Sequence, residues 1–169
     1  ASPLIGGHNY LHEQLEQEIA RFLRNEYAIS YTSGYAANCS TLLAIMGKED
    51  IAIMDMFTHA SVFDGCLCTN TKRFLHNNID SLSHVLKNTK EYKNRFVIID
   101  GVYSQEGDVA PLDKIYTVCR EYNAFLIVDD AHGIGVLGKT GRGIIEDYNL
   151  LDKVDMITGT FSKSFGSVG

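Results

Sequence analysis

Two five-residue apolar segments that each end in an aspartate place the strongest constraint on the fold of this chain. Residues 96–100 read FVIID and residues 125–129 read FLIVD. Segments without alternating polar positions are typical of strands buried on both faces, as in a parallel sheet covered by helices. The same kind of pattern predicts further strands over 51–55 and 154–158, and a short strand over 27–31.

Helical periodicity alternates with these strands along the chain. Apolar residues spaced three and four apart predict an amphipathic helix that ends near Asn25 and a mostly buried helix over 34–46. We expect Asp80 to cap a third helix and Pro111 to begin a fourth. The alternation predicts one α/β domain over residues 1–169, with a mainly parallel sheet between helices.

Charge and cysteine spacing argue against several classes of protein. The net charge of −6 leaves no basic face for phosphates, so we expect no nucleic-acid partner. No segment approaches 18 consecutive apolar residues and the start of the chain has no signal-peptide pattern, so we expect no membrane span and a cytoplasmic protein. The cysteines have no zinc-ligand spacing, so we expect reduced thiols and no metal site at Cys39, Cys66, Cys68 and Cys119.

Polar residues follow three of the predicted strands, where parallel sheets bind their ligands. These residues lie at 100–104, 129–132 and 160–163, so an acid, a histidine, a serine and a lysine should meet at one edge of the sheet.

The strand pattern alone leaves the roles of these residues open. Asp129 could bind a ligand or merely cap the turn after its strand. Because side chains alternate along a strand, Asp130 should point the other way, toward solvent. Lys163 could be an ordinary surface lysine, but its small and polar neighbours would also let a carbonyl group reach its amine.

A glycine pattern in the same region resembles a dinucleotide-binding motif, which we reject. Gly133, Gly135 and Gly138 spell G-x-G-x-x-G after a predicted strand. That motif must open a helix and needs an acid at the end of the next strand. Here the segment 139–143 reads KTGRG, and Asp155 precedes its strand.

The sequence resembles the α-oxoamine synthases, a group of fold-type-I pyridoxal-phosphate (PLP) enzymes, in six short motifs that occur in the same order as in that family. The resemblance covers essentially the whole chain and rests on YTSGYAAN, FTHASVFDG, HNN, DGVYSQEGDVAPL, IVDDAHGIGVLGKTGRG and TGTFSKSFGSVG. It implies the large domain of an aspartate-aminotransferase-like PLP-dependent transferase. Members also have an N-terminal segment and a smaller C-terminal domain, so we expect this chain to be part of a longer protein.

The resemblance implies roles for four residues around the PLP ring. Lys163 would bind the cofactor covalently, and Asp129 would pair with the pyridine nitrogen, which helps the ring to withdraw electrons. His132 would pair with the phenolic oxygen, and His59 would stack on the ring. We expect these four residues to be the catalytic ones.

The resemblance also implies residues that bind the rest of the cofactor. Ser33, Gly34 and Tyr35 lie where backbone N–H groups at a helix start would hold the phosphate. Thr160 would add a hydroxyl to the phosphate, and Ser104 would lie close to the ring.

The implied reaction is a decarboxylative condensation of a small amino acid with an acyl-CoA to an α-amino ketone, in a homodimer with shared sites. HEQLEQEIARFL and the DDAH string resemble 8-amino-7-oxononanoate synthases, whereas GTFSKSFGSVG resembles serine palmitoyltransferases. A 2-amino-3-ketobutyrate CoA ligase activity, a plain aminotransferase and a non-catalytic partner subunit are the alternatives. The last would lack the lysine, and an aminotransferase would lack the DDAH and THAS strings together.

Overall fold

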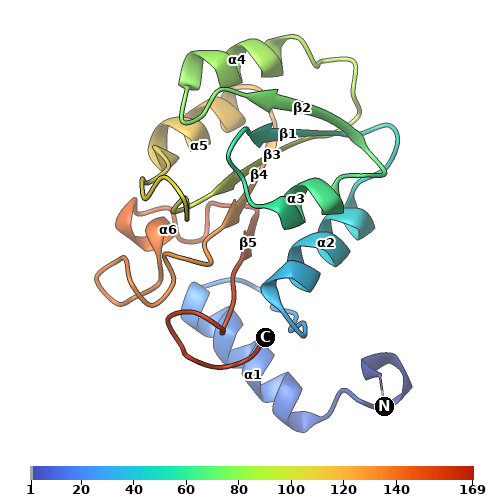
Figure 1. Cartoon of the computed structure of the whole chain (residues 1–169), viewed down its shortest axis with the longest axis vertical. Helices are drawn as coiled ribbons and strands as arrows, with labels where there is room; N and C mark the ends of the chain where they lie inside the picture. Colours follow the sequence, from blue (N-terminus) through green and yellow to red (C-terminus); the bar gives the residue numbers. More distant parts are fainter. Residues whose placement is uncertain (1) are drawn as a thin grey trace.

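A five-stranded sheet forms the centre of the molecule, which a computed structural model describes over residues 2–169. The predicted domain of 1–169 includes Ala1, which lies outside the described residues. The strand order is β2-β1-β3-β4-β5 and every neighbouring pair is parallel (Figure 1). The mainly parallel sheet is therefore confirmed. The strands are β1 (Ile51–Asp55), β2 (Asn70–Phe74), β3 (Arg95–Asp100), β4 (Phe125–Asp129) and β5 (Met156–Thr158).

Helices cover both faces of this sheet. A 3-10 turn, η1 (Pro3–Ile5), precedes the first helix. The helices are α1 (Tyr10–Leu23), α2 (Gly34–Ile45), α3 (Ala60–Gly65), α4 (Ile79–Lys87), α5 (Leu112–Glu121) and α6 (Ile144–Asp147). None of the helices in the described part of the chain is long and apolar enough to cross a membrane.

Side-chain alternation along the strands divides the core into two clusters. Ile53, Val97 and Val128 point to the face that α4, α5 and α6 cover. Met54 and Ile98 point to the other face, where α2 and α3 pack. Because both faces are covered at the centre of the sheet, β1, β3 and β4 are mostly apolar up to the aspartate that ends each of them, which explains their uninterrupted apolar pattern.

Two predictions about strands need correction, and one strand was not predicted. Segment 27–31 forms no strand, because no described strand lies beside it to accept its hydrogen bonds. β5 begins at Met156, two residues later than predicted. β2 was not predicted, because four of its five residues are exposed and polar or charged at this edge of the sheet.

The helix predictions also need two corrections. α2 is only partly buried: Leu43 and Ile45 are exposed, and Asn38 and Leu42 are its buried residues. The cap of α4 lies two residues before Asp80: Asn78 accepts a hydrogen bond from the Ser81 N–H, and the helix begins at Ile79.

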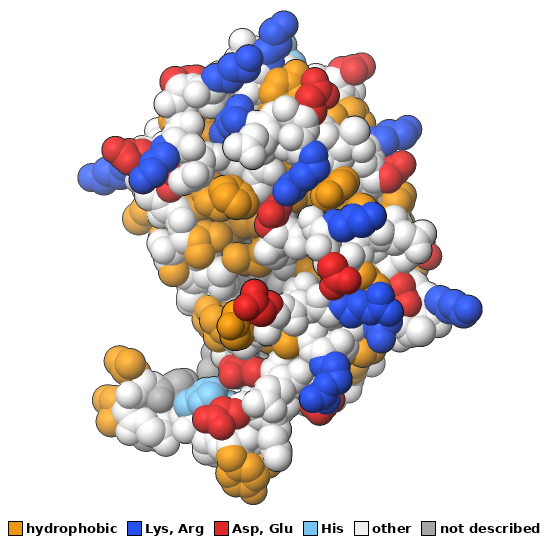
Figure 2. Space-filling view, turned by 180° about the vertical axis from the view of Figure 1, so that it is seen from behind, with side chains coloured by type: hydrophobic (Ala, Val, Ile, Leu, Met, Phe, Trp, Pro, Cys, Tyr) orange, Lys and Arg blue, Asp and Glu red, His pale blue; other side chains and the backbone are white. Residues whose placement is uncertain are grey.

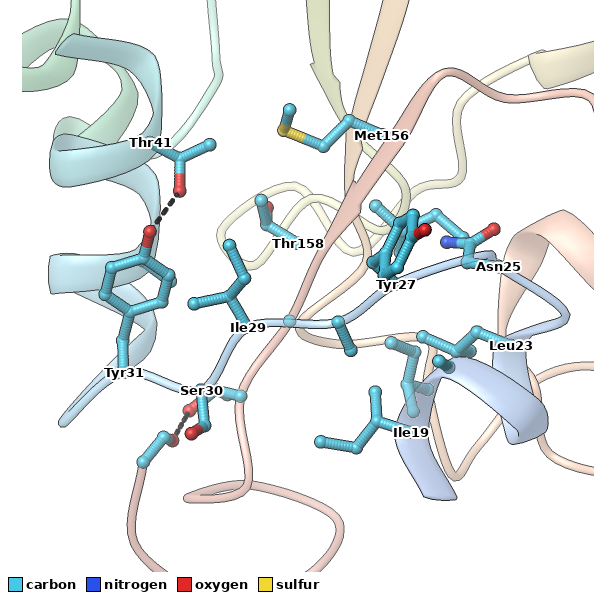
Figure 3. A pocket seen from close by; sticks show the side chains of 18 of the residues that line it. Ile19, Leu23, Asn25, Tyr27, Ile29, Ser30, Tyr31, Thr41, Met156 and Thr158 are labelled. Atoms are coloured by element: carbon cyan, nitrogen blue, oxygen red, sulfur yellow. Dashed lines mark hydrogen bonds between the residues drawn. The ribbon is translucent and has the colours of Figure 1, made fainter. Parts of the chain in front are cut away.

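An apolar cavity of about 510 Å³ lies between β5 and segment 27–31, which does not pair with β5. Figure 3 shows Ile19 and Leu23 of α1 on one side and Met156 on the other. Ile29 lies between them, and Tyr31 accepts a hydrogen bond from Thr41 of α2 at 3.1 Å. The segment before α2 is therefore held by side chains rather than by a strand ladder.

Candidate functional site

The polar residues that follow β3, β4 and β5 lie at one edge of the sheet, as the sequence predicts. Asp100 and Asp129 end neighbouring strands and are partners in the register of the ladder. Asp129 is in turn the register partner of Thr158, just before the segment that leads to Lys163. Parallel strands bring all three carboxyl ends to the same side.

Two hydrogen bonds hold the carboxylate of Asp129, which is 8% exposed. Its Oδ1 accepts from the Ala131 N–H at 3.1 Å, and its Oδ2 accepts from the Asn38 amide nitrogen at 2.6 Å. We did not single out Asn38 from the sequence. Its position in the string YAAN, on a helix that was predicted to be mostly buried, could have indicated a buried amide with a specific partner.

Asp100 is a second buried acid at this edge. Burial, and then the charge of Asp129, raise its pKa to about 8. Its Oδ1 accepts the His59 backbone N–H at 3.3 Å. Asp100 is therefore largely uncharged at neutral pH, and it connects β3 to the turn that carries His59.

Lys163 and His132 meet across the site. Lys163 Nζ lies 2.7 Å from His132 Nε2. Burial, and then the positive charge of Lys163, lower the pKa of His132, so its ring is neutral and accepts a hydrogen bond from the lysine. The charge of Asp129 partly opposes this lowering of the His132 pKa. Hydrogen bonds through Asn38 and Ser61 link Asp129 to His59, so the predicted catalytic residues lie at one edge of the sheet.

His59 is held at the start of α3. Its Nδ1 lies 2.8 Å from Ser61 Oγ and accepts the Ser61 backbone N–H at 3.3 Å. The ring packs edge-on to that of Tyr35, with 6.4 Å between centroids. No other aromatic ring within residues 2–169 pairs with the imidazole of His59.

The start of α2 has free backbone donors beside Thr160. Ser33 Oγ caps the helix by accepting the Ala36 N–H at 3.1 Å, while the described residues offer no hydrogen-bond acceptor to the N–H groups of Gly34 and Tyr35. A Cβ added to Gly34 would lie 3.1 Å from Thr160 Cβ. Glycine therefore permits the close approach that places the Thr160 hydroxyl at this helix start.

Three predicted cofactor contacts differ from the expectation in this structure. The Thr160 hydroxyl donates to the Gly169 carbonyl at 2.6 Å. Ser104 is exposed in the loop after β3, and no side-chain hydrogen bond is found for it in residues 2–169. The Tyr35 hydroxyl donates to Asp64, and this hydrogen bond raises the tyrosine pKa to about 12.

The prediction that Asp130 points to solvent is wrong. Its side chain is fully buried, and its Oδ2 accepts the Ile144 N–H at 2.9 Å at the start of α6. Side chains at Gly133 or Gly143 would collide with its carboxylate. Alternation does turn it away from Asp129, but the second face of the sheet is covered by α6 rather than by water. Gly133 of the rejected motif, together with Gly143 just before α6, thus makes room for a buried acid.

No group of three or more histidine, cysteine or acidic residues within residues 2–169 is placed to hold a metal ion. The candidate site is instead a lysine, two histidines and two buried acids beside a helix start.

Comparisons with known proteins agree with this geometry. The family model described as "Aminotransferase class I and II" matches residues 4–169. An 8-amino-7-oxononanoate synthase from Coprothermobacter proteolyticus is 43% identical over 98% of this chain. A serine palmitoyltransferase from S. paucimobilis with bound PLP and myriocin superposes on the whole chain with a TM-score of 0.96 and 35% identity. A Sphingomonas wittichii serine palmitoyltransferase does so with the same TM-score and 37% identity. The chain spans about 43% of the length of each of these three proteins.

Proposed function

This chain belongs to the aminotransferase class I and II family, and on that premise we propose that it is the cofactor-binding part of a PLP-dependent C-acyltransferase. The observation that carries the proposal is the contact of Lys163 Nζ with His132 Nε2, beside Asp129 and His59. The similarity to 8-amino-7-oxononanoate synthases and serine palmitoyltransferases supports the α-oxoamine synthase group.

The residues at the sheet edge fit the chemical groups of PLP. Lys163 would supply the amine that links to its aldehyde, and Asp129 would pair with the ring nitrogen. The free N–H groups of Gly34 and Tyr35, with the Thr160 hydroxyl, would hold the phosphate at the start of a twelve-residue helix. When bound, PLP withdraws the electrons of a broken bond at the amino-acid Cα.

The chain's own residues would move and hold protons around that bond. The Lys163 amine would act as the general base that accepts the Cα proton. Neutral His132 accepts a hydrogen bond from Lys163, so it orients that amine. His132 would also pair with the phenolic oxygen of the ring, His59 would cover one ring face, and Ser104 would approach it from the loop after β3.

We propose that the substrates are a small amino acid and an acyl-CoA, and that the product is an α-amino ketone. The similarity to 8-amino-7-oxononanoate synthases supports that activity, while serine palmitoyltransferase or 2-amino-3-ketobutyrate CoA ligase activity is the alternative. Lys163 argues against a non-catalytic partner subunit.

We also propose a cytoplasmic homodimer whose sites lie at the subunit boundary. The start of the chain and α1 project from the body of the molecule (Figure 1). Leu4, Ile5 and Leu11 on this projection are 96%, 81% and 56% exposed, and Figure 2 shows apolar side chains at its far end. A second subunit would cover them. The four free cysteines agree with a reducing compartment.

Covalent labelling tests the cofactor assignment. The full-length protein should be yellow with PLP, and borohydride reduction followed by peptide mapping should place a pyridoxyl group on Lys163. Lys163→Ala should lose the colour and the label, whereas Lys153→Ala, in the exposed turn before β5, should keep both. A label on any other lysine would contradict the assignment.

Product analysis tests the reaction. The full-length protein should be incubated with glycine, alanine, serine or threonine and with acyl-CoAs of several chain lengths. We expect release of both CO2 and free CoA, and formation of an α-amino ketone, from one preferred pair. Transfer of the amino group to a keto acid, without use of acyl-CoA, would indicate an aminotransferase instead.

A further inference from the structure

We propose that Asn38 and Ser61 are positioning residues that hold His59 in one tautomer and Asp129 in one orientation. The proposal rests on the proposed function, because that function places His59 and Asp129 against the cofactor ring. Neither Asn38 nor Ser61 has a role in the reaction proposed above.

A single buried amide connects the two ring-contacting residues. Asn38 is 4% exposed on α2, and its Nδ2 lies 2.6 Å from Asp129 Oδ2 at the end of β4. The same nitrogen lies 2.9 Å from Ser61 Oγ on α3, and Ser61 is fully buried. Ser61 Oγ in turn lies 2.8 Å from His59 Nδ1. Hydrogen bonds between four side chains therefore connect the end of β4, α2 and the start of α3.

The direction of each hydrogen bond follows from what each atom is able to donate. An amide nitrogen has two hydrogens and accepts nothing, so Asn38 donates to both Asp129 and Ser61. Ser61 Oγ accepts from Asn38 and has one hydrogen left, which it gives to His59 Nδ1. The Ser61 backbone N–H also points to Nδ1, at 3.3 Å. Nδ1 is thus an acceptor, and the proton of the neutral imidazole sits on Nε2.

This arrangement suits a site in which His59 and Asp129 must keep a fixed geometry. Hydrogen bonds from buried groups limit a ligand-contacting ring or carboxylate to one rotamer. Because Asn38 donates to both Ser61 and Asp129, loss of its amide should alter the hydrogen bonds of His59 and of Asp129 at the same time. A purely structural role for Asn38 would satisfy a buried amide without affecting the His59 tautomer.

The tautomer is measurable without cofactor. In full-length apoprotein with ¹⁵N-labelled histidine, long-range ¹H–¹⁵N spectra should show His59 protonated at Nε2 and bare at Nδ1. Asn38→Ala frees the Ser61 hydroxyl to accept a hydrogen bond, and Ser61→Ala removes that hydroxyl. Each variant should raise the Nδ1-protonated fraction of His59 about five- to tenfold, the effect of about one hydrogen bond.

Thr41→Val is the matched control. Thr41 lies on the same helix, and its hydroxyl bonds to Tyr31 outside the network. The control should keep the tautomer of the unaltered protein. Thermal unfolding identifies variants that do not fold, and Ser61→Ala decides the question if Asn38→Ala is one of them.

Cofactor affinity supplies a second readout. Asn38→Ala should weaken PLP binding about tenfold, because Asp129 loses a charge-assisted hydrogen bond. An unchanged His59 tautomer in folded variants of both residues, or an equal change in Thr41→Val, would overturn the proposal. If the unaltered protein bound no PLP, the proposed function would fail, whereas the tautomer of the apoprotein would still decide this inference.

Discussion

At the scale of single residues, two adjacent aspartates have opposite environments and should have separable effects. Asp129 faces the site, whereas Asp130 lies under α6. Asp129→Asn should retain the fold and bind PLP but lose most α-proton exchange, because an amide cannot pair with a protonated ring nitrogen as a carboxylate does. Deuterium uptake at the amino-acid Cα, followed by NMR, measures this loss. Exchange in Asp130→Asn should fall much less, and an equal loss in both variants would contradict our assignment.

The buried Asp130 should instead affect the pH dependence of stability. Burial raises its pKa to about 7 from 3.8, so the folded state holds the proton more tightly than the unfolded state. Its contribution is fully present below about pH 4 and is lost as pH rises through 7. Asp130→Asn should flatten the fall in unfolding free energy over this range by up to roughly 1 kcal/mol per pH unit. Urea unfolding from pH 4 to 8 measures the difference. The pKa of Asp100 is also raised in the folded state. Asp100 is present in the unaltered protein and in Asp130→Asn, so its effect cancels when the two are compared.

At the scale of elements, the start of α4 depends on one cap. Asn78 accepts the Ser81 N–H at 2.8 Å, while Asp80 lies inside the first turn. Asn78→Ala should lower the unfolding free energy by about 1 kcal/mol, the usual cost of a lost N-cap. Asp80→Ala should cost a few tenths of that, since it removes only a favourable charge near the helix start. Chemical denaturation of both variants checks the order, and a larger loss in Asp80→Ala would refute it.

A histidine bridge joins the end of β1 to the loop that carries Ser104. His76 Nδ1 contacts Asp55 and its Nε2 contacts Asp108, each at 2.9 Å, and its ring packs edge-on to Tyr103. Burial opposes protonation, but the two carboxylates outweigh it and raise the pKa of His76.

The bridge should therefore stabilise the protein most below about pH 6.5 and weaken as pH rises through the raised pKa. The advantage of the unaltered protein over His76→Gln should shrink by about 1 kcal/mol between pH 6 and 9. Unfolding titrations at both pH values measure it. His84→Gln, an exposed change on α4, serves as the control and should show no such trend.

At the scale of the whole molecule, the projecting α1 leads to a prediction about assembly. We expect the full-length protein to be a homodimer that buries about 2,000 Å² or more, the range of obligate interfaces. Sedimentation velocity at micromolar concentration measures this. Leu11→Glu, at an exposed apolar position of α1, should favour the monomer, while Glu13→Gln on the same helix should not. A stable monomer that turns over substrate would disprove shared sites.

Local patterns were sufficient for most of the sheet and for the edge at which polar residues gather, whereas the roles of those residues came from the family resemblance. β1 and β4 have the bounds expected from their apolar segments, because burial on both faces requires apolar residues at every position. Lys163 and His132 follow strands of one parallel sheet, so their convergence was predictable from the order of elements alone.

Contacts between distant segments decided the remainder. Segment 27–31 has strand-like residues but no neighbouring strand within residues 2–169, and a strand exists only through its partner's hydrogen bonds. Asp130 and Asn38 are buried by elements that lie far from them in sequence, so neither the α6 cap nor the amide between Asp129 and Ser61 was visible in the residue pattern. Alternation states to which face a side chain points, but only packing determines whether that face meets water, a helix or another side chain.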